Sequence, residues 1–167
     1  MTRIAPLDRR VGEGDEVKLG ESLFRVIDTG GHTLGHISYY DAADHTVFVG
    51  DTLFALGCGR LFEGTAEQMW TSLSKLAALP DDTRVYCAHE YTASNARFAL
   101  SVDHAPALKT RADQIFAARE RGEWTVPTTI GAEKATNPFL RAPVLRPDLE
   151  PAEAFGAVRA AKDNFKG

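Results

Sequence analysis

Three polar residues, each following an apolar stretch, are the clearest indication of chemistry in this sequence. His32 lies in a glycine-flanked turn, Asp51 follows residues 46–50, and His89 follows residues 84–88. The apolar stretches are typical of β-strands, so the three side chains could meet at one rim of a sheet. Imidazole and carboxylate groups are the ligands that divalent metals use in hydrolases, where a carboxylate can bridge two ions. Each residue alone is better explained as a polar turn residue, but together they favour metal ligation.

Five further residues could contact a small ligand, four of them basic. Arg159, Lys162 and Lys166 are spaced i, i+3 and i+7, so they share one face of a helix. From the spacing alone, a solvated basic face explains them, and the same holds for Arg60, which follows a glycine-containing loop. Tyr91 comes two residues after His89 and could reach a ligand bound there, but a packed aromatic is nearly as good an explanation.

Composition sets the broad class of the protein. The chain has 167 residues, is 44% hydrophobic and 25% charged, and has a net charge of −4. This composition is typical of an ordinary globular protein and argues against nucleic-acid binding, which usually requires a strong basic excess. No apolar run approaches the roughly 18 residues that a membrane helix requires, and no secretory signal is evident. With only Cys58 and Cys87 present, we expect a cytoplasmic protein without disulfides.

The elements that must position these residues change in character near residue 95. We expect strands over residues 22–27, 37–40, 46–49 and 84–88, the second and third forming an antiparallel hairpin, with a flexible loop at residues 57–59. We expect helices over residues 65–79, 92–102, 106–121 and 151–165, with Thr92 as the cap of the second. The sequence therefore predicts an α+β protein with two parts, residues 1–95 and a helical domain of residues 96–167.

Taken together, the motifs resemble those of glyoxalase II, also called hydroxyacylglutathione hydrolase, a family with the metallo-β-lactamase fold. The metal turns alone would indicate only the superfamily, whereas the glycine loop and the C-terminal helix select this branch. The resembling segments are Gly-His-Thr-Leu-Gly-His at 31–36, Gly-Asp-Thr-Leu-Phe at 50–54, Gly-Cys-Gly-Arg-Leu-Phe-Glu-Gly-Thr at 57–65, Val-Tyr-Cys-Ala-His-Glu-Tyr-Thr at 85–92, Asn-Pro-Phe-Leu-Arg at 137–141 and Arg-Ala-Ala-Lys-Asp-Asn-Phe-Lys at 159–166.

This resemblance implies an αββα sandwich, of which the chain would hold the second half, followed by a small helical domain that binds glutathione. It also implies two divalent ions, zinc first, with iron and manganese as alternatives. His32 would ligate the first ion, Asp51 would bridge both, and His89 would ligate the second. The resemblance places Arg60, Tyr91, Arg159 and Lys162 at positions that bind the glutathione part of the substrate. Their positive charges suit the two carboxylates of glutathione.

The reaction implied by the resemblance is hydrolysis of the thioester S-D-lactoylglutathione to glutathione and D-lactate, a step of methylglyoxal detoxification. A hydroxide activated by the two metals would attack the thioester carbonyl. No catalytic residue beyond the metal ligands is implied. Phe62 stands where the family often has tyrosine.

One family motif, Thr-His-x-His-x-Asp-His, does not occur in the sequence. In the family it precedes the residue that matches His32 and supplies further ligands to both ions. We therefore expect an N-terminally incomplete chain with an incomplete ligand set, weak metal retention, and a sheet with an exposed apolar face or an unpaired edge.

Other functions remain open at this stage. The chain could be a non-catalytic fragment that binds glutathione conjugates, or the exposed sheet could drive self-association. Within the superfamily, the alternative enzymes are a glutathione persulfide dioxygenase, a lactonase and a β-lactamase. The C-terminal Arg159–Lys166 segment favours the thioesterase over these three.

Overall fold

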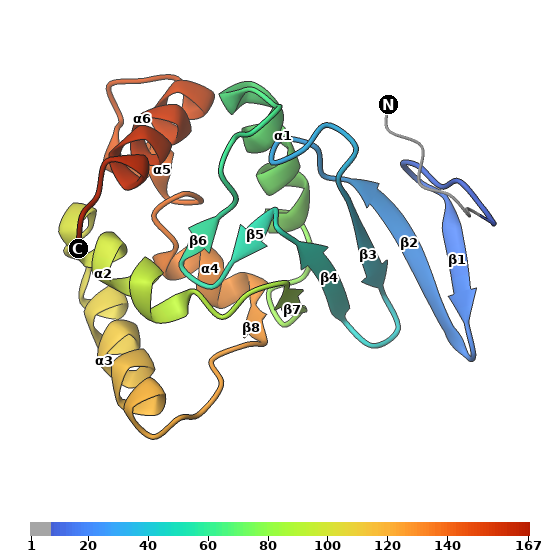
Figure 1. The fold of residues 1–167 in the computed structure, drawn as a ribbon, viewed down its shortest axis with the longest axis horizontal. Coiled ribbons are helices and arrows are strands. Elements are labelled where there is room, and N and C mark those ends of the chain that lie inside the picture. The colour runs from blue at the N-terminus through green and yellow to red at the C-terminus, as the bar shows by residue number, and fades with distance from the viewer. Residues whose placement is uncertain (1–7) are drawn as a thin grey trace.

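A mixed six-stranded sheet forms one side of the molecule in this computed structural model, which describes residues 8–167. Its strands lie in the order β1-β2-β3-β4-β7-β8, and a short two-stranded sheet, β5-β6, lies beside it (Figure 1). The strands are β1 (Glu16–Leu19), β2 (Ser22–Asp28), β3 (Ile37–Asp41), β4 (Thr46–Gly50), β5 (Leu53–Phe54), β6 (Gly57–Cys58), β7 (Arg84–Cys87) and β8 (Thr128–Thr129).

Six helices gather on the other side of the molecule (Figure 1). The first begins with a capping box, because the Thr65 hydroxyl accepts from the Gln68 amide and the Gln68 side chain accepts from the Thr65 amide. Three helices carry proline in their first turn, where a missing N–H costs nothing. The helices are α1 (Ala66–Ala77), α2 (Thr92–Val102), α3 (Pro106–Glu120), α4 (Ile130–Thr136), α5 (Ala142–Leu145) and α6 (Pro151–Asp163).

Most elements that the sequence predicts are confirmed, with three corrections. Thr92 is the first helical residue of α2 and not its cap, and the capping position, Tyr91, makes no side-chain cap bond. The prediction of a flexible loop at residues 57–59 is wrong, because Gly57 and Cys58 form the buried strand β6. Helices α4 and α5 were not expected, since both are too short to show a clear apolar period.

The main core lies between one face of the sheet and helices α1 and α6. Ile27, Val47 and Val85 project from β2, β4 and β7 into this core, where Leu73 of α1 and Phe155 of α6 are also buried. A second, smaller core lies between α2 and α3 and receives a side chain from the β5–β6 turn. Its buried members are Leu56, Ala96, Ala99, Leu108, Ala112 and Ile115.

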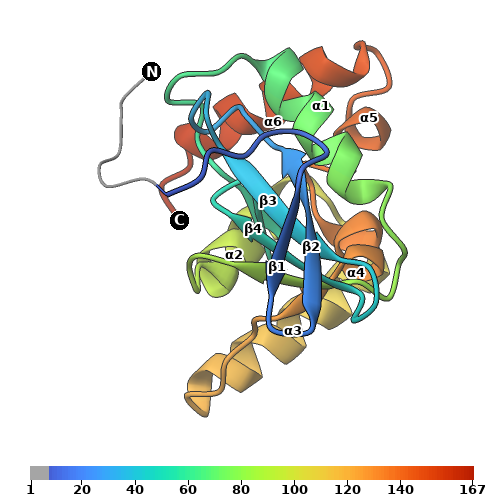
Figure 2. The ribbon, with the colours of Figure 1, turned by 90° about the vertical axis from the view of Figure 1, so that its right-hand side faces the viewer.

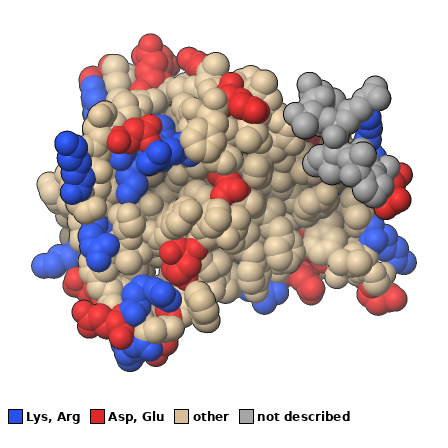
Figure 3. Space-filling model, in the orientation of Figure 1, with Lys and Arg blue, Asp and Glu red and all other residues tan. Residues whose placement is uncertain are grey.

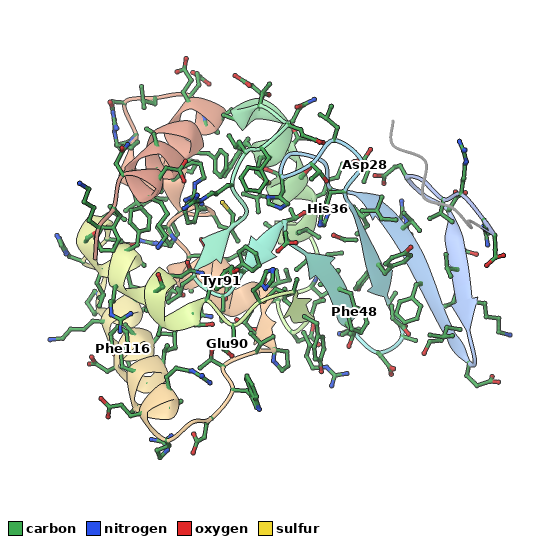
Figure 4. The ribbon with its side chains drawn as sticks, viewed as in Figure 1. Asp28, His36, Phe48, Glu90, Tyr91 and Phe116 are labelled. Carbon is green, nitrogen blue, oxygen red and sulfur yellow. The ribbon has the colours of Figure 1, made fainter. Side chains whose placement is uncertain are left out.

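The opposite face of the sheet carries aromatic side chains that no helix of the described chain covers. Tyr39, Phe48 and Tyr86 are register partners on neighbouring strands, so they share this face, and Phe24 packs edge-on against Phe48. Phe48 is 44% exposed, and Leu19 on the edge strand is 73% exposed. Figure 4 labels Phe48 on β4. Figure 2 shows β1 and β2 in front with the helices behind them. The expected exposed apolar face is therefore present.

Among residues 8–167, no helix combines the length and the apolar character that crossing a membrane requires.

Candidate active site

Three strands that run in the same direction bring the candidate metal ligands to one rim of the sheet. β3 is antiparallel to both β2 and β4, and β7 is parallel to β4, so β2, β4 and β7 share one direction. His32 follows β2, Asp51 follows β4 and His89 follows β7, so each lies beyond the carboxyl end of its strand. Side chains beyond such strand ends converge, which is why ligands often bind there. All three line one pocket of about 440 Å³.

Asp51 and His89 form the closest pair in this pocket. Asp51 Oδ1 lies 3.3 Å from His89 Nε2, because β4 and β7 are parallel neighbours. The ring of Tyr91 stacks on the ring of His89 with centroids 4.8 Å apart and planes 16° apart. Tyr91 also packs edge-on against Phe54 of β5, and Figure 4 shows Tyr91 beside the β5–β6 hairpin. The stacked contact with Tyr91 and the nearby ring of Phe54 together restrict the orientation of the His89 imidazole.

His32 is held in a defined tautomer. Its Nδ1 lies 2.8 Å from the carbonyl oxygen of Arg60, and because a carbonyl only accepts, Nδ1 carries the proton and donates. Nε2 of His32 is then left with a free lone pair, the form in which histidine ligates metals. Gly59 makes this arrangement possible, since a Cβ there would overlap the Asp51 carbonyl and press on His32.

His36, labelled in Figure 4, supports the site although it does not line the pocket. Its Nε2 accepts a hydrogen bond from the Asp51 backbone amide at 3.1 Å, and its Nδ1 lies 3.0 Å from the hydroxyls of Thr29 and Thr52. Burial lowers the pKa of His36, which favours the neutral ring that this bonding pattern requires. His36 therefore fixes the backbone at Asp51.

The donor types suit a divalent cation, but their number does not. In the described part of the chain, no group of three His, Cys, Asp or Glu residues is close enough to hold an ion. Residues 1–7 contain none of these types in their sequence. A catalytic zinc usually has three protein ligands, whereas here Asp51 and His89 make a close pair and His32 stands apart on the same pocket wall.

A basic wall faces these residues across the pocket. Arg159 is only 5% exposed, and its Nη1 and Nη2 donate to the Cys58 carbonyl oxygen and to Asp163. Its Nε has no partner among the described residues. Asp163 also lies 3.8 Å from the exposed guanidinium of Arg60. One carboxylate thus holds two guanidinium groups at the pocket, so the Arg159 side chain is largely engaged within the protein.

Lys162 completes the basic wall. Its Nζ donates to the Ser94 carbonyl oxygen at 3.3 Å and lies over the rings of Phe98 and Phe165. Burial lowers the pKa of Lys162, and the nearby positive charges of Arg159 and Arg60 add to this effect. Lysine and arginine side chains gather on the helical side of the face shown in Figure 3, whereas its centre is mostly uncharged. The pocket thus combines a cationic wall with an imidazole–carboxylate wall.

Two family profiles match the chain in succession. The metallo-β-lactamase superfamily profile matches residues 2–89, and the profile for the hydroxyacylglutathione hydrolase C-terminus matches residues 90–165. The hydroxyacylglutathione hydrolase of Ruegeria pomeroyi is 56% identical over 98% of this chain, and that of Maricaulis maris is 54% identical over 98%. The chain belongs to the hydroxyacylglutathione hydrolase family. It spans about two thirds of the length of these two relatives, 67% in each case.

Solved structures place this family member in the metallo-β-lactamase fold. ETHE1 from Myxococcus xanthus superposes with a TM-score of 0.64 at 29% identity, covering 97% of this chain and 55% of that one. The BLEG-1 B3 metallo-β-lactamase gives a TM-score of 0.55 at 27% identity, covering 84% of this chain and 52% of that one. Membership of this superfamily implies divalent-metal binding.

All seven site residues that the sequence predicts for this hydroxyacylglutathione hydrolase family member line the one pocket: His32, Asp51, Arg60, His89, Tyr91, Arg159 and Lys162. Sequence reasoning missed Asn95 and Ser94, which also line it. A signal existed for Asn95, because it lies four residues after Tyr91 and so on the same side of α2. Burial raises the pKa of the Cys58 thiol to about 12, so this pocket residue stays protonated at neutral pH and is a poor nucleophile.

Proposed function

We propose that the chain contributes to hydrolysis of the thioester S-D-lactoylglutathione to glutathione and D-lactate. Water adds to the thioester carbonyl, the carbon–sulfur bond breaks, and the glutathione thiolate takes up a proton. The observation that carries the proposal is one pocket that holds the imidazole–carboxylate wall and the basic wall together. The names of the relatives support the choice of substrate.

In this proposal the two walls have separate roles. His32, Asp51 and His89 would contribute donors to divalent-metal binding, His32 to a first ion, His89 to a second and Asp51 to both, and the metal would supply activation of the attacking water. Zinc is the preferred metal, with iron or manganese as alternatives. Because the described residues provide fewer than three converging donors, the pocket is proposed as one part of the catalytic site.

The basic wall binds the carboxylates of glutathione. Arg60 can turn toward a ligand because its side chain is 68% exposed and its only ion pair among the described residues, with Asp163, is long at 3.8 Å. Lys162 and the Nε of Arg159 provide further positive charge at the same wall, and Tyr91 provides a hydroxyl and a ring face. Residues 96–167 would form the part that holds glutathione, after a boundary near residue 95. The free thiols of Cys58 and Cys87 suit a reducing, cytoplasmic setting.

Replacing Arg60 by alanine tests the basic wall. We expect the affinity for glutathione, measured by calorimetry, to fall by about 10- to 100-fold, because one charge-assisted hydrogen bond contributes about 1.5–3 kcal/mol. The matched control is Arg146→Ala, since Arg146 is an exposed arginine that pairs with Asp148 outside the pocket. Equal losses in both variants would contradict the role of Arg60, and an absence of heat with the unchanged protein would contradict the proposal itself.

Turnover distinguishes the enzyme from a pure binder. With zinc supplied, we expect loss of the thioester absorbance of S-D-lactoylglutathione. Binding of glutathione without any such loss would identify the chain as a non-catalytic binder of glutathione conjugates.

A second candidate property, self-association through the sheet, is favoured by the edge strand β1, which pairs only with β2 among residues 8–167. Leu19 at the end of β1 is largely exposed. Antiparallel pairing of β1 with a second copy, centred on Val17, would place Glu16 of each chain opposite Lys18 of the other. Opposite charges in such cross-strand positions stabilise pairing. The second copy would also extend the uncovered aromatic face.

Light scattering with charge-reversed variants tests this pairing. We expect the unchanged protein to self-associate and the K18E variant to shift toward monomer, because two glutamates would then face each other. The double variant E16K/K18E restores opposite charges and should restore association. A monomeric unchanged protein, or a double variant that stays as monomeric as K18E, would rule out this edge.

A further inference from the structure

The turn between β5 and β6 is held from outside by side chains of the helical region. Leu56 in this turn has a φ of 56°, a left-handed backbone conformation that is unfavourable for a branched residue. Such a conformation persists where surrounding contacts fix it. The hairpin that this turn closes lies between Asp51, which follows β4, and Arg60, which follows β6. Its conformation therefore bears on both walls of the pocket.

Glu133 of α4 holds the centre of this turn. Its side chain is fully buried, and Oε2 accepts from the Leu56 backbone amide at 2.9 Å and from Asn137 Nδ2 at 2.9 Å. Its other oxygen, Oε1, accepts from the Thr128 hydroxyl at 2.6 Å and from Arg111. Four donors thus converge on one carboxylate, and the positive charge of Arg111 compensates its burial.

Two asparagines hold the rest of the turn. Asn137 donates to the carbonyl oxygens of Phe54 and Gly57, at 3.2 and 3.0 Å. Asn95 of α2 donates to the carbonyl oxygen of Ala55 at 3.1 Å. Glu133 therefore fixes the turn in two ways. It accepts directly from the Leu56 amide, and it orients the Asn137 side chain, which donates to the carbonyl oxygens of Phe54 and Gly57.

The segments on either side of the turn connect it to the pocket. Asp51 lies two residues before β5, and the Gly59 amide donates back to the Thr52 carbonyl oxygen at 3.2 Å. Arg60 then presents the carbonyl oxygen that fixes the His32 tautomer. Movement of the turn would shift Asp51, Arg60 and His32 together.

We propose that Glu133 is a positioning residue for the pocket, acting through the β5–β6 turn; its effect on glutathione binding rests on the function proposed above. A carboxylate is required at this place because every group that faces it is a donor. Glutamine would keep the size of the side chain but would turn an amide NH2 toward two of those donors. The β5–β6 turn would then lose part of the hydrogen bonding that fixes it, whereas helix α4 would keep its conformation.

Glu133→Gln tests the proposal, with Asp103→Asn as the matched control. Asp103 is also a buried carboxylate bonded to an arginine, Arg141, and none of its hydrogen bonds among the described residues goes to the β5–β6 turn. The melting temperatures of both variants are measured so that comparisons are made under conditions of equal stability.

Amide hydrogen exchange and NMR shifts are the first readout. We expect exchange at the Leu56 amide to rise by about 10- to 100-fold in E133Q, the loss of one hydrogen bond to a charged group. The amides of Asp51 and Arg60 should shift in E133Q and stay unchanged in D103N. An unchanged Leu56 exchange rate, or equal changes in D103N, would overturn the proposal.

Glutathione affinity is the second readout. We expect E133Q to bind glutathione about tenfold more weakly than D103N at matched stability, and equal affinities would overturn the link to the pocket. If the unchanged protein does not bind glutathione, the proposed function fails, while the NMR and exchange results still decide the role of Glu133.

Discussion

Replacing Asp51 by asparagine is expected to weaken zinc binding by about 100-fold or more. Loss of a residue that merely supports a ligand typically costs about 10- to 100-fold, and Asp51 carries the negative charge nearest to His89, 3.3 Å away. An amide of the same shape carries no charge and offers only one acceptor oxygen. Titration with zinc against a chromophoric chelator measures the change.

The matched control is Asp82→Asn. Asp82 also pairs with a histidine, since its Oδ2 lies 2.7 Å from His45 Nδ1, but this pair is on the surface and outside the pocket. We expect D82N to bind zinc like the unchanged protein. If D51N also binds zinc unchanged, the ions do not bind at the Asp51–His89 pair.

The unchanged protein should itself hold zinc loosely, because the described residues provide fewer than three converging donors. Metal analysis after dialysis should find less than one ion per chain. Two retained ions per chain would contradict this expectation.

Phe155→Ala is expected to lower the free energy of unfolding by about 3–5 kcal/mol. Phe155 of α6 is fully buried, and its ring lies 6.3 Å from that of Trp70 on α1 and 6.1 Å from that of Phe139. Truncation would leave a cavity where α6 meets α1, and the surrounding helices can close it only in part. Urea unfolding followed by circular dichroism measures the loss.

Val144→Ala serves as the control, because Val144 is 66% exposed and such surface changes usually alter stability by less than about 0.5 kcal/mol. A loss below about 1 kcal/mol for Phe155→Ala would mean that α6 is not an integral part of the main core. Since α6 also carries Arg159 and Lys162, the basic wall would then not be fixed to the sheet.

Local patterns predicted much of the fold. The capping box at Thr65, the prolines at positions 106 and 151 and the alternating strands all act within a few residues of sequence, so the sequence alone placed their elements correctly. The β5–β6 hairpin and α4 were not predicted. Their conformations depend on partners far away in sequence, such as Glu133, which accepts from the amide of Leu56, 77 residues earlier.

The same distinction between local and long-range interactions applies to the candidate site. The sequence by itself determined which residue types were available and that His32, Asp51 and His89 follow strands, because strand ends are set locally. Only the tertiary structure decided that these strands run in one direction, that Asp51 and His89 approach to 3.3 Å, and that His32 exposes Nε2. Direction, distance and tautomer all depend on backbone groups brought together by long-range pairing. For that reason the structure also showed that Arg159 is mostly engaged by Cys58 and Asp163, which no helical spacing could indicate.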